Sequence, residues 1–248
     1  MGGALLSGWV KGSEQFTIVD PALEKTLDGV RLVRDAEALE GELFDCLIVA
    51  IKPQLIDTVM PGYEALLTED GYVLSIAAGA SIARLAKALG GAPVIRVMPN
   101  LPAAVGKGVS GICASADVSA NHLDHAKDMM GRNGKVIEVS DEDALDRFTA
   151  IAGSGPGYVF ELARTYTMAA MELGFDEAEA RAMVLGTIEG TIAMASADDT
   201  PLEELRNSVT SKGGTTAAGL AALNADGQLT DLLSNTAKAA YDRAVELR

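Results

Sequence analysis

Short apolar runs alternate with helical segments through the first half of the chain. The runs are apolar at consecutive positions, which is typical of strands buried on both faces of a parallel sheet. The predicted strands cover residues 16–20, 46–51, 72–76, 94–97, 108–114 and 135–139, and helices are expected over 3–11, from 53, over 81–89 and over 121–130. This alternation predicts the α/β class, with a doubly wound parallel sheet between helical layers.

The pattern changes near Val139, after which apolar positions follow helical spacing only. Within this half, Asp176 and Glu179 have the spacing of a capping box, which marks the start of a helix. No repeat and no low-complexity linker separates the two halves. The sequence therefore predicts two domains, residues 1–139 and 140–248, of which the second is all-helical.

A glycine-rich break interrupts the helical segment 145–174. The stretch Gly153-Ser-Gly-Pro-Gly157 contains Pro156, which has no backbone N–H, so a helix is expected to restart with Pro156 at its first position. Beyond the break one helical face is apolar and is predicted to be buried; it comprises Val159, Leu162, Tyr166, Ala169 and Leu173. The break is either a corner between two helices or a place where another backbone or a small ligand approaches closely.

Three loops follow successive predicted strands, at residues 50–53, 77–79 and 98–100. Ligands of doubly wound sheets bind at the carboxyl ends of the strands, and these loops consist of small or rigid residues that let a ligand lie against the backbone. Each loop alone is compatible with an ordinary turn. Together, on successive strands, they favour a cofactor site.

Two further features are compatible with ligand binding. Asp20 ends the first predicted strand, where an acid in a dinucleotide-binding fold binds the adenosine ribose and disfavours a 2′-phosphate; the alternative is a helix N-cap ahead of Pro21. The loop at residues 211–216 opens a helix, whose free amides and neighbouring hydroxyls would bind an anion such as a carboxylate. The alternative for this loop is a turn between helices.

Composition narrows the classes of function. The net charge of −15 excludes nucleic acid as a partner, because its phosphates would be repelled. No run reaches the roughly 20 apolar residues of a membrane span and no secretory signal is found, so a cytoplasmic protein is expected. Cys46 and Cys113 are interpreted as free thiols, with no metal site. His122 and His125 are expected on a solvated helix face, so any reaction must need little acid–base chemistry.

Four motifs together resemble the pyrroline-5-carboxylate reductase family: Val49-Ala-Ile-Lys-Pro53, Arg96-Val-Met-Pro-Asn-Leu-Pro102, Thr149-Ala-Ile-Ala-Gly-Ser-Gly-Pro-Gly-Tyr158 and Val209-Thr-Ser-Lys-Gly-Gly-Thr-Thr216. The resemblance implies reduction of 1-pyrroline-5-carboxylate to L-proline by NAD(P)H, the last step of proline biosynthesis. It also implies a Rossmann domain over residues 1–139 and an all-α domain over 140–248 that binds substrate and forms a homodimer. Such dimers commonly assemble into decamers.

The resemblance also implies roles for individual residues. Thr149 would be the catalytic residue, lying beside the ring nitrogen of the substrate to position or protonate the imine. The residues expected to hold the substrate carboxylate are Ser211, Gly214, Thr215 and Thr216. The residues expected to contact NADPH or NADH are Gly2, Asp20, Ala50, Ile51, Lys52, Pro53, Ala78, Gly79 and Asn100. Hydride transfer to a protonated imine needs placement more than a strong base, which agrees with the shortage of histidine.

The sequence departs from the family pattern at the cofactor site. Met1-Gly2 aligns with the end of the family's Gly-x-Gly-Asn-Met-Gly motif, so the first strand and most of the phosphate loop are lacking. This lack is expected to destabilise the domain and to remove amides that bind pyrophosphate, unless the start codon is assigned too late. Asp20-Pro21 replaces the family's frequent Ser, Thr or Asn-Arg, which favours NADH. Arg34-Asp35-Ala36 replaces an asparagine near the adenosine in some members.

Two other functions are compatible with the sequence. One is a non-catalytic oligomeric homologue with an impaired cofactor site, which the truncated phosphate loop motivates. The other is a related Rossmann reductase that acts on a hydroxy acid or another cyclic imine. Lysine-dependent hydroxy-acid dehydrogenases usually carry a lysine in the long interdomain helix, and the segment 145–174 contains none, which disfavours them.

Overall fold

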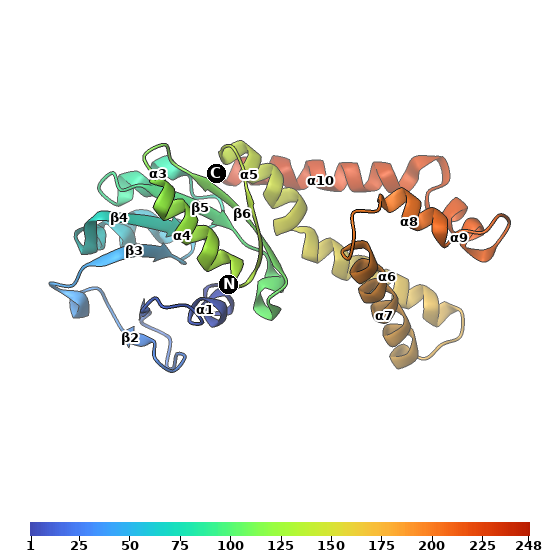
Figure 1. Ribbon diagram of the computed structural model, residues 1–248, viewed down its shortest axis with the longest axis horizontal. Helices are drawn as coiled ribbons and strands as arrows, with labels where there is room; N and C mark the ends of the chain where they lie inside the picture. The colour runs from blue at the N-terminus through green and yellow to red at the C-terminus, as the bar shows by residue number, and fades with distance from the viewer. The chain divides into compact units, whose positions relative to one another are not determined.

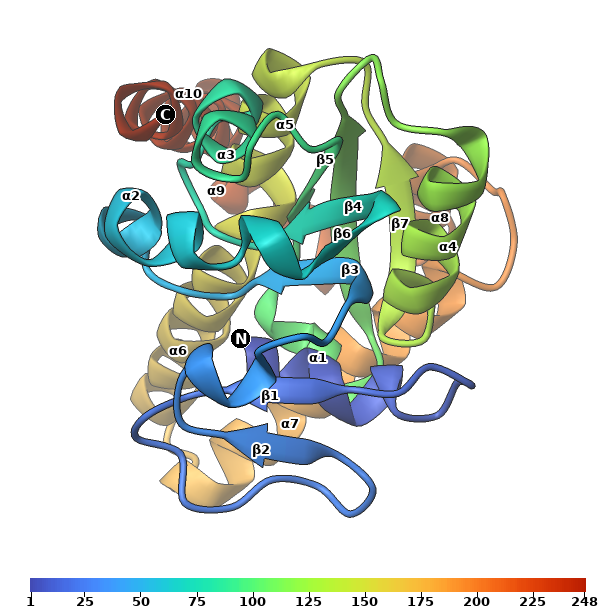
Figure 2. The ribbon, with the colours of Figure 1, turned by 90° about the vertical axis from the view of Figure 1, so that its left-hand side faces the viewer.

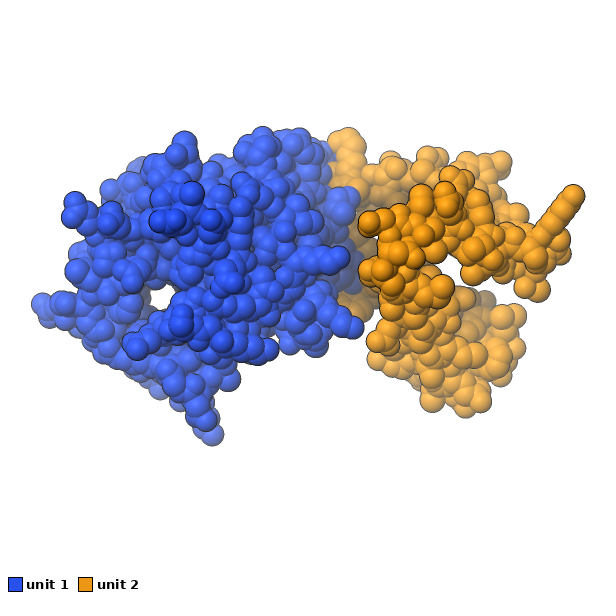
Figure 3. Space-filling model, viewed as in Figure 1, with its two compact units in different colours: residues 1–156, 239–248 blue, residues 157–238 orange.

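A computed structural model describes all residues from Met1 to Arg248. The chain forms two compact units, which are described separately (Figure 3). The first unit comprises Met1–Pro156 together with Ala239–Arg248, and the second comprises Gly157–Lys238. The division of function between residues 1–139 and 140–248 stays a prediction.

All six predicted strands form, and the chain adds a short one that the sequence pattern did not indicate (Figure 1). The strands are β1 Thr17–Val19, β2 Arg31–Val33, β3 Phe44–Val49, β4 Leu67–Ser75, β5 Val94–Met98, β6 Gly108–Ala114 and β7 Gly134–Glu138. The helices are α1 Gly2–Trp9, α2 Ile56–Val59, α3 Ile82–Ala88, α4 Ala120–Gly131, α5 Glu142–Phe148, α6 Gly155–Glu172, α7 Glu177–Ala195, α8 Leu202–Ser208, α9 Thr215–Leu223 and α10 Gln228–Leu247. The additional strand, β2, is only three residues long and begins with an arginine, so it carries no recognisable apolar run.

The main sheet has the order β3-β4-β5-β6-β7. Strands β3, β4 and β5 are parallel as predicted, but β6 runs antiparallel to β5, and β7 is parallel to β6. The wholly parallel expectation is therefore wrong at this end of the sheet. The cause is the connection from β5 to β6, a single short helical turn at Leu101–Val105, because a parallel crossover needs a dozen or more residues.

Strands β1 and β2 form a separate parallel pair without ladder hydrogen bonds to the main sheet. Ile18 of β1 and Ile48 of β3 nevertheless pack against the same apolar cluster, whose buried members include Leu5 and Trp9 of α1. Figure 2 shows the pair next to β3, and Figure 3 shows an opening through the first unit. One edge of β1 and one edge of β3 are thus left without a strand partner. The expectation that a central strand is lacking stays a prediction.

Helices cover both faces of the main sheet (Figure 2). Alternate residues of β4 lie in different apolar clusters: Tyr72 and Leu74 pack with α1 and α4, whereas Val73 packs with α2 and α3. This alternation follows from the two-residue period of a strand. Helix α5 approaches β6 closely at Gly111, where a Cβ atom would lie only 2.6 Å from the ring of Phe148.

The second unit is helical throughout. Asp176 caps α7 as predicted: its side chain accepts a hydrogen bond from the Glu179 amide at 2.8 Å, and its own amide donates to the Glu179 carboxylate at 3.3 Å. The apolar face predicted to be buried on α6 is instead exposed, with Leu162 55% and Leu173 81% exposed. The prediction is wrong for the single chain, because the chain itself supplies no element that covers these side chains.

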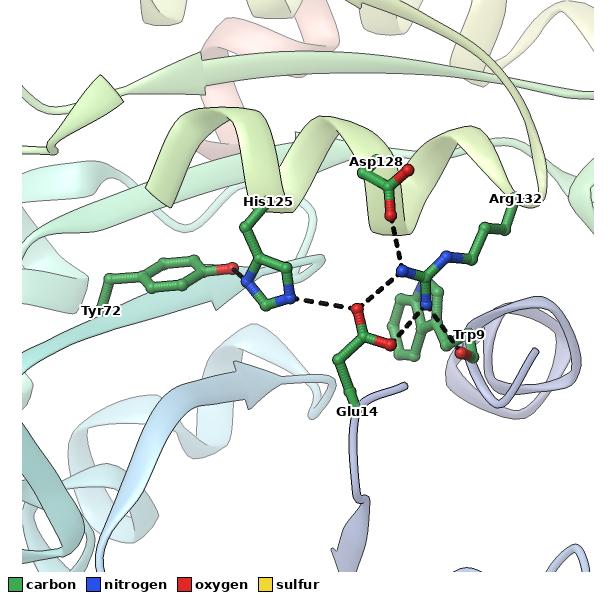
Figure 4. A network of polar contacts seen from close by, with 6 residues as sticks. All are labelled: Trp9, Glu14, Tyr72, His125, Asp128 and Arg132. Atoms are coloured by element: carbon green, nitrogen blue, oxygen red, sulfur yellow. Dashed lines mark hydrogen bonds and ion pairs between the residues drawn. The ribbon is translucent and has the colours of Figure 1, made fainter. Parts of the chain in front are cut away.

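A polar network in the first unit fastens the segment after α1 to α4 (Figure 4). Glu14 accepts two hydrogen bonds of 2.6 Å from Arg132, which also donates to the carbonyl of Trp9 at 2.9 Å. His125 contacts Glu14 through Nε2 at 3.2 Å and the hydroxyl of Tyr72 through Nδ1 at 3.0 Å. Since a carboxylate only accepts, Nε2 carries the proton and Nδ1 accepts from Tyr72.

The predicted solvated histidine face is therefore wrong. His125 lies in the network, and the His122 ring stacks on Tyr72 with a centroid separation of 4.8 Å. The polar neighbours of the two histidines in sequence hide this environment, because Tyr72 and Glu14 come from distant segments. Neither histidine belongs to the predicted site.

The Glu14–Arg132 pair gives stability a specific pH dependence. The hydrogen bonds from Arg132 lower the pKa of the Glu14 carboxyl from 4.5 to about 2. A depressed folded-state pKa stabilises the fold above the unfolded value and loses that contribution as pH falls from about 4.5 to about 2. We expect Glu14→Gln to be less stable than wild type in urea unfolding near neutral pH, with the difference shrinking across this window. A difference that stays constant down to about pH 2 would contradict the assignment.

Candidate functional site

A single π-helical turn leads into the predicted glycine break and shares only Gly153 with it. Thr149–Gly153 has π geometry, with the Ser154 amide donating to the Thr149 carbonyl five residues earlier at 2.9 Å. Helix α6 then begins at Gly155, so Pro156 is its second residue and not its first as predicted. In a regular helix the Ala152 carbonyl would accept from the amide of residue 156, but proline has no N–H to donate.

Asn100 supplies the missing donor. Its Nδ2 donates to the Ala152 carbonyl at 3.0 Å, and its Oδ1 accepts from the Val109 amide at 2.9 Å. Asn100 follows β5 and is only 6% exposed, so both polar ends of its side chain are used inside the protein. The sequence-based assignment of Asn100 to the cofactor missed this contact. The absent N–H at Pro156 is readable in the sequence, but the residue that compensates for it is not.

Thr149 lies at the start of this turn, beside the carboxyl end of β5. Its hydroxyl donates to the Leu145 carbonyl at 2.7 Å, and the residue is half-buried. A Cβ at Gly153 would lie 3.4 Å from both the Thr149 methyl group and Met98 Cγ. Glycine at 153 thus leaves only van der Waals space between the turn and the end of β5. An added Cβ would meet only side chains at Gly153 and nothing within 4 Å at Gly155 or Gly157, so no other backbone segment approaches the break closely, and the approach of a small ligand stays a prediction.

Helix α5, which carries the chain into the turn, is fixed at its start. Asp141 caps the helix by accepting from the Ala144 amide at 2.7 Å. Glu142 pairs with Arg96 of β5 at 2.5 Å and also accepts from the Ile82 amide at 2.9 Å. The Arg96 side chain is 3% exposed, so this ion pair is a buried link between the sheet and α5. The sequence analysis did not identify it.

The end of α10 adds a second attachment. Arg248 pairs with Asp146 at 3.0 Å, and the Tyr241 hydroxyl donates to Asp143 at 2.6 Å. Burial raises the pKa of the Asp146 carboxyl, while the Arg248 charge opposes that rise. Helix α5 is consequently held from the sheet on one side and from the end of the chain on the other.

The three predicted loops lie at one edge of the sheet. They follow β3, β4 and β5, which are parallel neighbours, so their carboxyl ends meet there. The predicted cofactor residues in the first two loops are Ala50, Ile51, Lys52, Pro53, Ala78 and Gly79. Gly2 belongs with them, because a Cβ at Gly2 would lie 3.4 Å from the Ala50 Cβ. At Gly79, where φ is +75°, an added Cβ would lie 2.5 Å from the Leu247 carbonyl, so the end of α10 packs on this turn.

Asp20 shapes the turn after β1. Its carboxylate accepts hydrogen bonds from the amides of Ala22 at 2.8 Å and Leu23 at 3.0 Å. No helix follows, so the N-cap alternative is wrong, although the side chain caps a turn. The Arg34 guanidinium closes the same turn by donating to the carbonyls of Leu23 at 2.7 Å and Pro21 at 3.2 Å.

The predicted carboxylate loop lies in the second unit. The Gly214 amide donates to the Ser211 carbonyl at 3.0 Å, and Gly214 is the N-cap of α9 without a side-chain capping bond. The first intrahelical bond runs from Ala218 to Gly214, so the amides of Thr215 and Thr216 have no acceptor within the helix. The Ser211 hydroxyl lies so close to Gly214 that a Cβ there would overlap it. The loop therefore presents backbone donors and three hydroxyl side chains together.

Two structural findings bear on other classes of function. No group of three or more histidine, cysteine, aspartate or glutamate side chains is placed to hold a metal ion. None of the helices combines the length and apolar character required to cross a membrane.

Comparisons with known proteins agree with this arrangement. Residues 142–247 match the family model described as pyrroline-5-carboxylate reductase dimerisation. The pyrroline-5-carboxylate reductase of Haemophilus influenzae is 35% identical over 91% of this chain and 86% of its own length. The structure of the Coxiella burnetii reductase superposes with a TM-score of 0.89 at 31% identity, over 99% of this chain and 94% of the other. The Plasmodium falciparum pyrroline carboxylate reductase, solved with NADP bound, gives 0.86 at 26% identity, over 100% and 94%.

The solved relatives share the α/β fold, and the family model matches the helical half. Identity above 30% over most of both chains does not favour a separate, non-catalytic class of homologue. The chain belongs to the pyrroline-5-carboxylate reductase family.

Proposed function

We propose that this protein reduces 1-pyrroline-5-carboxylate to L-proline with a nicotinamide dinucleotide, in the cytoplasm. Family membership over nearly the whole chain is the observation that carries the proposal. Its local support is the placement of Thr149 in a fixed turn near Met98 at the carboxyl end of β5, on the sheet edge where the parallel strands β3 and β4 also end. That edge is where doubly wound sheets bind nucleotides.

The residues at this edge fit part of a dinucleotide. The loops after β3 and β4 offer Ala50 and Ala78, both exposed and small, against which a flat cofactor can lie. Beside Ala50, α1 begins at Gly2 without a side-chain cap, and the first bonds of this helix come from Ala4 and Leu5. The amides of Gly2 and Gly3 are therefore available to an anion such as pyrophosphate. When bound, the cofactor supplies the hydride.

The chemistry requires little from the protein beyond placement. Hydride adds to the carbon of the ring C=N bond, the electron pair of that bond moves to nitrogen, and the protonated imine becomes the secondary amine of proline. We assign to Thr149 the task of orienting the ring nitrogen through its hydroxyl, which the Leu145 carbonyl already holds in one direction. Such orientation lowers the barrier mainly by removing rotational freedom from the reactants.

We assign the substrate carboxylate to the Ser211–Thr216 loop. Its support is the pair of free amides at Thr215 and Thr216, which lie at the positive end of the α9 dipole. Gly214 suits this task because a side chain would displace the Ser211 hydroxyl.

We also propose that NADH is preferred over NADPH. A 2′-phosphate near Asp20 would meet a carboxylate, and the neighbouring cation, Arg34, is held by the carbonyls of Pro21 and Leu23. Both of these bonds use Nη1, and they hold the guanidinium in the turn after β1. Asp20→Ser is the natural test of this preference, with the ratio of NADH to NADPH turnover as its readout.

A steady-state assay tests the function itself. Purified protein is expected to oxidise NADH in the presence of 1-pyrroline-5-carboxylate and to form proline in equal amount, because each hydride reduces one C=N bond. Absorbance of the reduced cofactor and quantitation of proline measure the two sides. Absence of turnover with both NADH and NADPH would reject the proposal.

Thr149→Ala is expected to lower kcat by about 10- to 100-fold while the Kd of NADH changes little, because the lost hydroxyl orients substrate and not cofactor. Thr236→Ala is the matched control, since the Thr236 hydroxyl also donates to the carbonyl four residues earlier, at 2.7 Å, and Thr236 is not among the residues assigned to substrate or cofactor. An unchanged kcat in Thr149→Ala, or an equal loss in both variants, would remove Thr149 from the reaction.

We propose in addition that two copies associate through the helical half. The molar mass in solution, which tests this dimer, also tests whether dimers assemble further into decamers. The support is the exposed apolar side chains of α6, among them Leu162 at 55% and Phe160 at 63% exposed, within the residues that match the dimerisation model. Large exposed apolar surfaces are unusual on a monomer and mark contacts with other chains.

Phe160→Glu is expected to reduce the molar mass in solution toward that of one chain, because it places a charge in the apolar contact. Light scattering coupled to gel filtration measures the mass. The matched control is Leu43→Glu, since Leu43 is 62% exposed but belongs to the first unit. A mass that changes equally in both variants, or in neither, would place the contact elsewhere.

A further inference from the structure

We propose that Asn100 is a positioning residue that holds the catalytic turn by replacing the backbone donor that Pro156 lacks. This inference rests on the proposed function for its kinetic consequence, but not for its structural one. It assigns to the Met-Pro-Asn turn a task inside the protein, distinct from contact with the cofactor.

The need for such a donor follows from covalent structure. The Ala152 carbonyl belongs to the π turn, and the residue four positions later is Pro156. Proline cannot complete this helical bond. Ala152 is half-buried, and a carbonyl shielded from water is destabilising without a donor, so the Asn100 amide stabilises the turn by replacing the donor that Pro156 lacks.

The orientation of the Asn100 amide is fixed by a second contact. The Val109 amide is a donor and faces Oδ1 at 2.9 Å, so Oδ1 must be the acceptor there. Nδ2 is thereby directed at the Ala152 carbonyl, at 3.0 Å. An aspartate would keep the bond from Val109 but would direct a carboxylate oxygen at a carbonyl oxygen.

The contact links the turn to two strands of the main sheet. Asn100 follows the buried strand β5 after Pro99, and Val109 lies in β6. Thr149 is three residues from Ala152 in the same turn, so a turn released from Asn100 moves the Thr149 hydroxyl as well. Asn100 itself is buried and acts on the reaction through Thr149.

The test measures the effect of substituting Asn100 in the native sequence and in a Pro156→Ala variant. In the native background, Asn100→Ala and Asn100→Asp are expected to lower kcat by about 10- to 100-fold, with the Kd of NADH within about twofold of wild type. Pro156→Ala restores an N–H four residues after Ala152. In that background we expect Asn100→Ala to lower kcat by less than about threefold, because the carbonyl has a second donor.

Hydrogen exchange gives a readout that is independent of turnover. The Ser154 amide, bonded to the Thr149 carbonyl, is expected to exchange faster in Asn100→Ala and to regain its protection in Asn100→Ala/Pro156→Ala. Met129→Ala is the control for general loss of stability, since Met129 is a buried core residue of α4 outside the site. It should lower the melting temperature without a selective change at Ser154 or in kcat.

The outcomes separate the two proposals. If wild type does not reduce the imine, the proposed function fails, and the exchange of the Ser154 amide alone decides the role of Asn100. Equal losses of kcat and of Ser154 protection in both Pro156 backgrounds would overturn the positioning role. A rise in the Kd of NADH without loss of kcat would assign Asn100 to the cofactor instead.

Discussion

The arrangement of the site depends on one constraint, which is that Pro156 has no backbone N–H to donate. It leaves the Ala152 carbonyl without its helical donor, and a buried carbonyl in that state costs about 1–3 kcal/mol. Asn100 meets this need from the end of β5, so the π turn is tied to the sheet at one defined place. The Arg96–Glu142 pair and the Arg248–Asp146 pair fix the preceding helix in the same way. The partners that hold α5 and the turn therefore come from two separate parts of the chain, β5 with the residues just after it and the end of α10.

Much of the fold was predictable because its determinants are local. Continuous apolar runs identified β3 to β7, and the Asp176 capping box identified the start of α7. The direction of β6 was not predicted, because it depends on the length of one connection and not on the composition of the strand. The apolar face of α6 was recognised correctly as apolar, yet burial is a property of what covers it, and within one chain nothing does.

The site, like the fold, was predictable from the sequence only where its determinants are local or follow from the topology. Loops after successive parallel strands meet at one sheet edge whatever their side chains, so topology alone brought the β3 and β4 loops together. The glycine break was visible because proline and glycine act on the backbone directly. The partners of Ala152, Glu142 and His125 lie 46 to 111 residues away in sequence, and no periodicity encodes such contacts. The interpretation of the two histidines failed for this reason.

Few titratable groups lie at the site, so the contacts that fix the turn have a large effect on the rate of the reaction. An enzyme that uses a general base gains part of its rate from proton transfer by a group of matched pKa. Here the hydride comes from the cofactor and the substrate carries its own charge, so the protein contributes geometry. If the groups that position the substrate are displaced by about 1 Å, the rate falls on the order of 100-fold, because positioning is the protein's main contribution. For a reaction of this kind, the buried amide that fixes a turn is as consequential as the hydroxyl that touches the substrate.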